Sequence, residues 1–422
     1  RPHRRDSNMN NRIVFAARIA AVAMLGLSTA FVSDADAQQR RSRQSPAQQQ
    51  QPAQTETSGQ TLHTTARQAI IIDFQTNAVL FEKSADERMP PSSMSKIMTA
   101  YMVFKEIKEG RLALTDEFTV SEKAWRIQGS KMFVPLGGKV KVEDLLRGMI
   151  IQSGNDACIV LAEGIAGSEQ AFAERMNEEA KRIGLTGSNF RNASGWPDPD
   201  HYMTTRDLAI LGIRLIKDFP EHYKYYAEKD FTYGVDEKGT PIKQGNRNPL
   251  LYKNTGADGI KTGHTEAAGY GLTASAVRDG RRIIMVLNGM PSMKNRAEES
   301  ERLLDWAYRE YGTYQVAKAG QVMDKADVWL GEQESVQLVS PQDVFVTLPR
   351  RARAQMKVTT SFDAPVPAPV KKGAEVGKLV VTAPGIDPIE APLVAEADVN
   401  KLGFTGRIAA SISHLLFGSS KK

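Results

Sequence analysis

A serine and a lysine stand three residues apart at the start of an apolar stretch, as Ser93 and Lys96 in the run Pro91-Ser-Ser-Met-Ser-Lys. If this stretch is helical, both side chains lie on one face. A serine hydroxyl attacks a carbonyl only when a base removes its proton, and lysine can be that base when burial and nearby positive charge lower its pKa. Free N–H groups at a helix start also stabilise an oxyanion. The spacing alone is a weak signal, because Ser419 and Lys422 repeat it in the tail.

A second polar cluster, Ser153-Gly154-Asn155, separates two apolar segments of helical composition, residues 142–151 and 156–165. Such an interruption places polar side chains on a loop within a packed region. Taken alone, the tripeptide is better explained as an ordinary turn between two helices.

A third cluster, Lys261-Thr262-Gly263-His264, comes just before an expected strand that starts near Tyr270. An ammonium group and a hydroxyl can together hold a substrate carboxylate. Glycine allows the substrate backbone to approach closely. The tripeptide Lys-Thr-Gly is, however, common by chance.

The elements that must position these clusters are one central helix and one sheet. We expect a helix from Ser93 to Glu109, preceded by two prolines and ended by Gly110, and apolar nearly all round as in the middle of a domain. Period-two apolar runs predict strands, and a helical apolar stripe predicts a closing helix. The expected strands are 69–74, 78–81, 271–277 and 282–288, and the closing helix is 295–311. We therefore predict a single α/β domain over residues 62–312, with one sheet built from distant segments.

The first 61 residues have a different composition. Arg12 and Arg18 precede an apolar stretch, residues 19–31, and then Ala35-Asp36-Ala37, which is the layout of a secretory signal peptide. We expect residues 1–37 to comprise this peptide, cleaved after Ala37, and some residues upstream of the true start. The glutamine-rich residues 38–61 predict a disordered linker.

The C-terminal third predicts two further parts. Short alternating apolar runs with proline and glycine between them indicate a small all-β domain over residues 313–399, a spacer or partner-binding module without a nucleophile and base. In residues 400–422, an apolar stripe with flanking basic residues suits a helix that lies in a membrane interface. The alternative is a tail helix docked on the β-domain.

Composition excludes several classes of function. The 422 residues are 41% hydrophobic and 25% charged, which is typical of globular proteins. The net charge of +6 is scattered along the chain, so we do not expect nucleic-acid binding. One cysteine excludes an intramolecular disulfide, and six dispersed histidines lack ligand spacing, so we expect no metal and no cofactor.

Together and in this order, the three clusters are far more specific than any one alone. With them, the sequence resembles the serine D-alanyl-D-alanine carboxypeptidases, the low-molecular-mass penicillin-binding proteins of the bacterial cell wall. The resemblance covers residues 62–418 and extends to Thr205-Arg-Asp and Asn246-Arg-Asn. It implies a penicillin-recognising serine transpeptidase-like α/β (α+β) fold, mainly an antiparallel sheet with helices. It also implies a small all-β C-terminal domain and a terminal amphipathic helix.

The resemblance further implies roles for the first two clusters. Ser93 attacks the carbonyl of the penultimate D-alanine of a peptidoglycan stem pentapeptide, and Lys96 is the general base. Ser153 relays a proton toward the leaving amine, while Asn155 positions the substrate or Lys96. Water then hydrolyses the acyl-enzyme, and β-lactam antibiotics become covalent inhibitors.

The resemblance also implies roles for the third cluster. Lys261 and Thr262 bind the terminal carboxylate with help from Arg247, and Gly263 admits the substrate backbone. The backbone N–H groups of Ser93 and His264 form the oxyanion hole, and the His264 side chain is a spectator. The implied location is the periplasm, on the outer face of the cytoplasmic membrane, with the C-terminal helix as the attachment.

Three other functions are weighed against this one. A class A-like β-lactamase needs a deacylating glutamate, and no Glu-x-x-Leu-Asn stands between Asn155 and Lys261. A peptidoglycan DD-endopeptidase more often lacks the C-terminal domain. A non-catalytic cell-wall-binding protein is favoured by loss of Ser93, Lys96 or Lys261, and all three are present.

Overall fold

The computed structural model describes residues 62–418. The signal peptide and glutamine-rich linker predicted from the sequence lie outside the described residues, as does the end of the tail.

A five-stranded antiparallel sheet organises the N-terminal part, in the order β2-β1-β9-β8-β7. Its strands come from both ends of the predicted domain, since Ile70 of β1 pairs with Val286 of β9. Their bounds are β1 Gln68–Asp73, β2 Val79–Lys83, β7 Ala257–Thr265, β8 Gly269–Arg278 and β9 Arg281–Met290. The predicted sheet of distant segments is confirmed.

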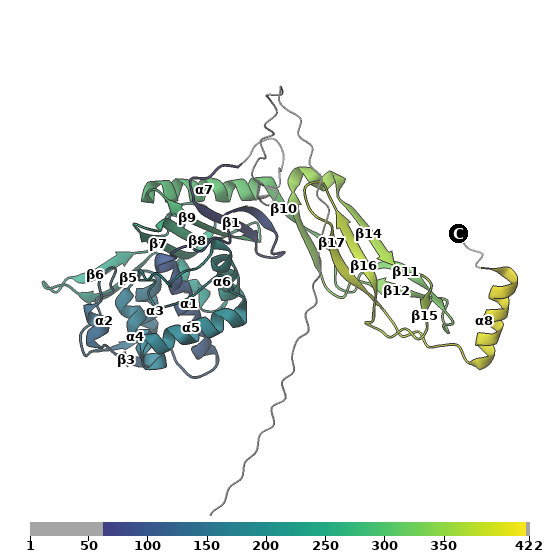
Figure 1. Cartoon of the computed structure of the whole chain (residues 1–422), viewed down its shortest axis with the longest axis horizontal. Coiled ribbons are helices and arrows are strands. Elements are labelled where there is room, and N and C mark those ends of the chain that lie inside the picture. The colour runs from purple at the N-terminus through teal and green to yellow at the C-terminus, as the bar shows by residue number, and fades with distance from the viewer. Residues whose placement is uncertain (1–61, 419–422) are drawn as a thin grey trace, which may run out of the picture. The chain divides into compact units, whose positions relative to one another are not determined.

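The sheet is covered on both faces because its strands alternate apolar side chains to either side. Ile70 and Ile72 belong to a core shared with the helical layer, whereas Ala69 and Ile71 belong to a second core beneath α7 (Met293–Glu310). Figure 1 shows α7 along one face of the sheet and the helices of residues 96–218 on the opposite side. The predicted residues Lys96 and Asn155 belong to helices on the latter side, whereas His264 stacks on Tyr270, which packs against the core beneath α7.

The helical layer surrounds α1 (Lys96–Lys108), whose residues from Lys96 to Phe104 are all buried. The other helices are α2 Glu122–Arg126, α3 Val142–Ile150, α4 Asn155–Ala166, α5 Glu169–Ile183 and α6 Thr205–Asp218. Serine or threonine N-caps begin α2, α5 and α6, where each hydroxyl accepts a first-turn N–H group. The short 3₁₀ helices are η1 Ser92–Ser95, η2 Tyr223–Ala227 and η3 Pro249–Tyr252.

The start of the central helix differs from the prediction. Ser93 lies in η1, and the α-helix begins only at Lys96. The cause is Ser92, whose φ of 53° turns the chain sharply and leaves a tight turn before the helix. The end of the helix, next to Gly110, is as predicted.

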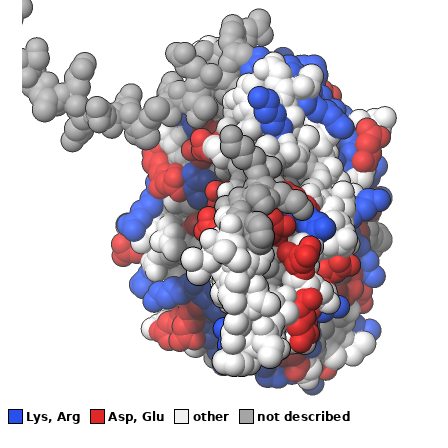
Figure 2. Space-filling view, turned by 90° about the vertical axis from the view of Figure 1, so that its right-hand side faces the viewer, with Lys and Arg blue, Asp and Glu red and all other residues white. Residues whose placement is uncertain are grey.

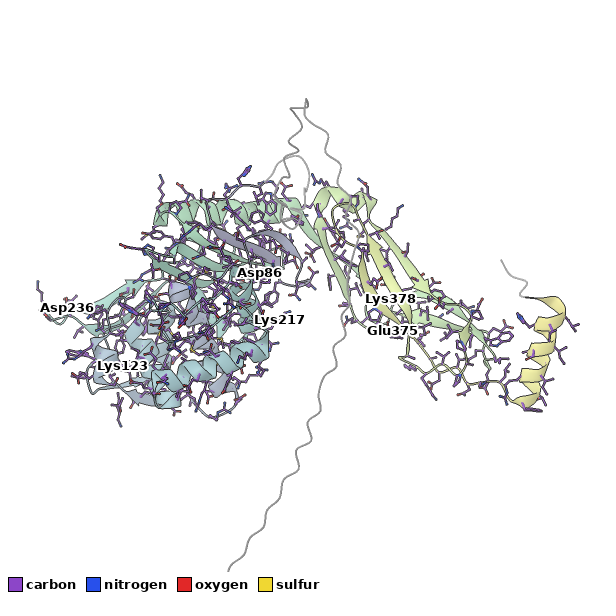
Figure 3. The ribbon with its side chains drawn as sticks, viewed as in Figure 1. Asp86, Lys123, Lys217, Asp236, Glu375 and Lys378 are labelled. Carbon is purple, nitrogen blue, oxygen red and sulfur yellow. The ribbon has the colours of Figure 1, made fainter. Side chains whose placement is uncertain are left out.

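Two small antiparallel strand pairs border this layer: β3 with β4 (Glu117–Thr119 and Lys139–Lys141), which are separated by α2, and the hairpin β5–β6 (Asp230–Val235 and Pro241–Gly245). Asp236, labelled in Figure 3, closes the β5–β6 hairpin because its carboxylate accepts the N–H groups of Lys238 and Thr240.

The C-terminal part is all-β, as predicted. A six-stranded sheet has the order β14-β16-β17-β12-β11-β15, and β10 pairs with β13. The bounds are β10 Tyr311–Ala317, β11 Val322–Trp329, β12 Ser335–Val339, β13 Val344–Pro349, β14 Lys357–Phe362, β15 Val366–Pro367, β16 Glu375–Thr382 and β17 Ile389–Ala395. Its interior contains small and branched apolar side chains such as Leu338, Leu379 and Leu393. A 3₁₀ helix, η4 (Arg350–Gln355), connects β13 to β14.

The last described element is α8 (Phe404–Phe417). Its predicted apolar stripe is exposed, since Phe404, Ile408, Ile412 and Leu415 all present at least 47% of their surface. No helix within residues 62–418 combines the length and apolar character needed to cross a membrane. Figure 2 shows acidic and basic side chains interspersed over one face of the molecule.

Candidate active site

The turn η1 places Ser93 beside Lys96. Ser93 is partly exposed, whereas Lys96 is only 1% exposed, and Lys96 Nζ lies 2.8 Å from Ser93 Oγ. The hydroxyl is thus accessible to a substrate while its neighbouring amine is shielded from water. This is the geometry that a nucleophile and its base require.

Lys96 Nζ has two further partners. It lies 2.8 Å from Asn155 Oδ1, at the start of α4, and 2.8 Å from the main-chain carbonyl of Ser194. Both oxygens can only accept hydrogen bonds. A neutral amine has two N–H groups and one lone pair, so these two acceptors direct the lone pair toward Ser93 Oγ.

Burial lowers the pKa of Lys96 to about 8. Cys158 and Asp156 raise it, while the positive charge of Arg247 lowers it further. With this pKa, most of Lys96 is still protonated at pH 7, and about a tenth is neutral and able to accept a proton.

The second cluster meets the third at a lysine. Ser153 is buried with a φ of 58°, a conformation that serine seldom adopts, and it accepts a 3.0 Å hydrogen bond from Lys261 Nζ. Lys261 lies on β7, and Gly263 follows on the same strand. A Cβ atom at Gly263 would lie 2.9 Å from the Pro91 carbonyl, so glycine lets β7 pack directly against η1.

Three cations gather near the third cluster. Burial lowers the pKa of Lys261 well below its usual value, and the charges of Lys96, Arg247 and Arg296 lower it further. Because like charges raise each other's energy, this region favours an anion such as a carboxylate. Arg296 is buried on α7 and was not identified from the sequence, since nothing in its local pattern distinguishes it from a surface arginine.

A loop of residues 128–134 connects Arg247 to Asn155. Arg247 Nη1 donates to Ser130 Oγ at 2.8 Å, the Ser130 carbonyl accepts from Asn155 N, and the Gln128 carbonyl accepts from Asn155 Nδ2. The buried Asp156 carboxylate anchors the same loop by accepting the N–H groups of residues 132–134. Sequence reasoning missed Asp156, whose only signal is its place directly after Asn155.

The remaining predicted residues lie along β7. Thr262 is buried, and its carbonyl accepts a 3.0 Å hydrogen bond from Lys261 Nζ. The His264 side chain is exposed and stacks on Tyr270, with ring centroids 3.9 Å apart. The structure thus joins Ser93, Lys96 and Asn155 by hydrogen bonds, joins Ser153 to Lys261, and ties Arg247 to the loop that holds Asn155.

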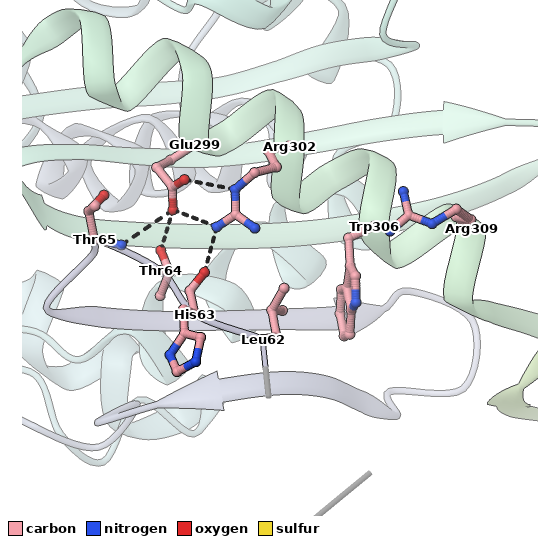
Figure 4. Close-up of a pocket in the computed structure, with 8 residues that line it drawn as sticks. All are labelled: Leu62, His63, Thr64, Thr65, Glu299, Arg302, Trp306 and Arg309. Carbon is pink, nitrogen blue, oxygen red and sulfur yellow. Dashed lines mark hydrogen bonds and ion pairs between the residues drawn. The ribbon is translucent and has the colours of Figure 1, made fainter. Parts of the chain in front are cut away.

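A separate pocket lies beside α7 (Figure 4). The Glu299 carboxylate there accepts hydrogen bonds from Thr64 and Arg302 and is fully engaged in holding the segment before β1 to the helix. The side chains lining this pocket include no lysine and no serine, so the serine–lysine chemistry belongs to the Ser93 cluster.

Comparison with known proteins identifies the family. Residues 53–292 match the family model described as D-alanyl-D-alanine carboxypeptidase, which is more than half of the chain. The chain belongs to this family. Residues 311–401 match the model of the penicillin-binding protein 5 C-terminal domain.

Individual relatives agree with the family models. The D-alanyl-D-alanine carboxypeptidase DacA of Haemophilus influenzae is 39% identical over 350 residues, which are 82% of this chain and 88% of the relative. The crystal structure of penicillin-binding protein 5 from Haemophilus influenzae superposes with a TM-score of 0.74 at 38% identity, over 82% of this chain and 100% of that one. Penicillin-binding protein D2 of Listeria monocytogenes, solved in its ampicillin-bound form, covers 59% of this chain at 28% identity and a TM-score of 0.53, and 100% of that chain.

The resemblance seen in the sequence is therefore confirmed, and so is the predicted fold class. The chain is a serine-type D-alanyl-D-alanine carboxypeptidase with a C-terminal all-β domain.

Proposed function

We propose that Ser93 is the nucleophile and Lys96 the general base of this carboxypeptidase. Ser93 Oγ attacks the carbonyl carbon of the penultimate D-alanine, and its proton passes to Lys96 Nζ. The carbon–nitrogen bond breaks, the terminal D-alanine leaves with a proton, and an ester to Ser93 remains. Water activated by Lys96 then hydrolyses the ester and restores the serine.

The placement of Lys96 supports this proposal most strongly. Its amine contacts Ser93 Oγ and two acceptor oxygens at 2.8 Å each, and burial lowers its pKa to about 8. Asn155 takes the positioning role, because its Oδ1 fixes one N–H group of the amine. No other lysine or histidine is hydrogen-bonded to Ser93 among the described residues.

Ser153 and Lys261 are assigned to proton delivery and carboxylate binding. Ser153 Oγ accepts from Lys261 Nζ at 3.0 Å, so its own proton is free to point toward the leaving amine. Lys261 and Thr262 hold the substrate carboxylate with Arg247, in the region where cations already crowd together. A bound carboxylate relieves that crowding, which favours binding of the D-alanine terminus.

The oxyanion hole is assigned to the backbone N–H groups of Ser93 and His264. Close packing of Gly263 against Pro91 and Met94 brings β7 and η1 together at that point. The His264 ring, which stacks on Tyr270, has no part in this assignment.

β-Lactam antibiotics fit the same scheme as covalent inhibitors. A β-lactam carries a reactive amide carbonyl beside a carboxylate, the two groups that Ser93 and the cation cluster recognise in the peptide. The ampicillin-bound form of the Listeria relative supports this assignment.

Attachment to a membrane surface is assigned to α8. Five large apolar side chains of this helix are exposed, and Arg407 is the single lysine or arginine among its residues. The free energy of such a helix falls when its apolar side enters a lipid interface. We further propose export to the periplasm, with the chain divided into the signal region 1–37, the linker 38–61, the catalytic domain 62–312, the β-domain 313–399 and the anchor 400–422.

The deciding experiment measures intact mass after the protein is mixed with benzylpenicillin, beside a Ser93→Ala variant. We expect one long-lived adduct on the parent protein and none on the variant. Consumption of the drug without an adduct indicates a β-lactamase, and an intact drug without an adduct indicates a non-catalytic protein. Release of free D-alanine from a stem pentapeptide, against cleavage of a cross-linked dimer, separates carboxypeptidase from endopeptidase.

The anchor is tested by deleting residues 402–422. We expect the shortened protein to remain acylated by benzylpenicillin but to stay in the supernatant when anionic vesicles are sedimented. Continued sedimentation with vesicles contradicts the assignment to α8.

A further inference from the structure

One loop encloses the turn that carries the nucleophile. Residues 189–203, here called the enclosing loop, supply the Ser194 carbonyl to Lys96 Nζ at 2.8 Å and the Ala193 carbonyl to Thr99 Oγ1 at 2.6 Å. Gly195 of this loop packs directly on the Ser92 carbonyl, where a Cβ atom has no room. The loop therefore holds one of the two acceptors that orient the Lys96 amine.

A buried histidine in this loop has no part in the chemistry described above. His201 is 4% exposed, and its Nδ1 accepts the backbone N–H group of Arg191 at 3.0 Å. Because Nδ1 is an acceptor, the proton of the neutral ring must be on Nε2. Nε2 lies 2.6 Å from Ser95 Oγ, so the ring donates to that hydroxyl.

The charge state of His201 agrees with this tautomer. Burial lowers the pKa of His201 to about 4; the nearby Asp198 raises it, and the nearby Lys96 lowers it. The ring is therefore neutral throughout the range in which Lys96 titrates. Because the His201 ring stays neutral and is held by two hydrogen bonds, it keeps a fixed position and does not carry protons.

Ser95 connects the His201 ring to the start of α1, next to Lys96. It is buried at the N-cap position of α1, directly before Lys96, yet its hydroxyl caps no N–H group of the helix. A serine at this position ordinarily accepts a first-turn N–H group. Here the hydroxyl is engaged with His201 instead, which fastens the enclosing loop to the start of α1.

We propose that His201 is a positioning residue for the acylation step: through Ser95 it holds the enclosing loop against α1, so that the Ser194 carbonyl keeps the Lys96 lone pair directed at Ser93. This inference rests on the proposed role of Lys96 as the base. It assigns no contact between His201 and the substrate.

A purely structural role is the competing explanation, because His201 also packs edge-on against Phe190 with ring centroids 5.6 Å apart. The two explanations differ in what they predict for Ser95. A packing role depends on the ring and is insensitive to the Ser95 hydroxyl, whereas the positioning role depends on that hydroxyl.

The test measures the second-order rate of acylation by benzylpenicillin against pH, for the parent protein and for Ser95→Ala, His201→Ala, His201→Gln and the double variant Ser95→Ala/His201→Ala. Glutamine is the conservative replacement, because its amide nitrogen lies the same number of bonds from the backbone as Nε2 and can donate to Ser95. Leu304→Ala, in the core beneath α7, is the control for lost stability without contact to the loop.

For Ser95→Ala we expect a loss of about 10- to 100-fold in acylation rate, because small misplacements of a catalytic group are costly. We also expect the acid limb of its pH–rate profile to move to higher pH. The reason is that a loosened loop admits water to Lys96, which raises the pKa of the amine. His201→Gln should recover most of the rate lost in His201→Ala. The double variant should be no slower than the slower single variant, as residues that act through one contact are not additive.

Acylation of folded Ser95→Ala at the parental rate with the parental pH profile overturns the inference and leaves the proposed function standing. The inference is likewise overturned if Leu304→Ala, at a matched loss of thermal stability, shows the same slowing. If the parent protein itself takes up no benzylpenicillin, the proposed function fails first and this inference fails with it.

Discussion

The catalytic domain and the C-terminal β-domain have contrasting interiors. The interior of the first contains Lys96, Asp156, His201, Lys261 and Arg296, each less than 9% exposed. Among the described residues of the β-domain, the buried polar side chains are Ser340 and Thr347, and neither is ionisable. The remainder of its interior is apolar.

This contrast shows where the chain accepts a cost in stability for chemistry. Burying a charge is expensive unless it is paired, and a lysine responds by lowering its pKa. In the catalytic domain burial lowers the pKa of Lys96 to about 8, which is the property that its proposed role as the base requires. The β-domain avoids the cost, as expected of a module that serves as a support or a binding surface.

The contrast is tested most severely by Lys96→Ala. Loss of the general base should slow acylation by benzylpenicillin by about 10²–10⁴-fold. Lys108→Ala is the matched control, because Lys108 lies at the other end of α1 and is bonded to the Asp218 carbonyl. We expect the control to react at the parental rate, and equal slowing in both variants contradicts a special role for the buried lysine.

A moderate effect is expected from pH. Because Lys96 must be neutral to accept a proton, the acylation rate should fall tenfold per pH unit below an apparent pKa of about 8 and level off above it. Arg247→Gln removes a positive charge that lowers the pKa of Lys96, so its acid limb should move to higher pH.

The control for that shift is Arg126→Gln, on the exposed surface of α2. It should leave the acid limb in place. An acid limb that stays unmoved in Arg247→Gln would falsify the electrostatic account of the base.

The smallest effect on acylation is expected from Leu338→Ala, in the core of the β-domain. Removal of this buried side chain should destabilise that domain by about 2–5 kcal/mol, because it leaves a cavity. Acylation of Ser93 at 25 °C should be unchanged. Thermal unfolding followed by near-UV circular dichroism, with acylation measured on samples taken along the ramp, checks both statements.

The matched variant is Leu146→Ala on α3, in the core of the catalytic domain. It should lower the temperature at which acylation is lost, whereas Leu338→Ala should not. If both variants lower the temperature at which acylation is lost by the same amount, the two domains unfold as one unit. The two interiors then differ in composition but not in their stability.

The sequence was sufficient to predict several side chains that the fold brings together at the candidate site. Ser93, Lys96 and Asn155 come together as the motifs implied, and the strand pair around Asp279-Gly280 forms because local turn chemistry determines it. In contrast, the hydrogen bond from Lys96 to the Ser194 carbonyl could not be predicted, because every residue has a main-chain carbonyl and residue type does not indicate which one accepts. The His201–Ser95 contact joins residues 106 positions apart and depends on how a loop folds back.

Some ends of the predicted helices could not be placed correctly from the sequence either, because they lie against residues that are distant in the chain. The helix expected to start at Ser93 starts at Lys96, since a sharp turn at Ser92, against which Gly195 of a distant loop packs, precedes it. The spacing of Tyr311 fits the apolar stripe and predicts that it ends the closing helix. It instead opens β10, where pairing with Pro349 of β13 decides its conformation.

Cys158 gives the molecule an internal reporter. It is the single cysteine of the chain, it is fully buried in α4, and burial raises its pKa to about 12. A thiol reagent therefore reacts slowly with the folded protein and rapidly once α4 becomes accessible. Labelling of this one sulfur follows the opening of the catalytic domain in a mixture of states and is blind to events confined to the β-domain, without any engineered probe.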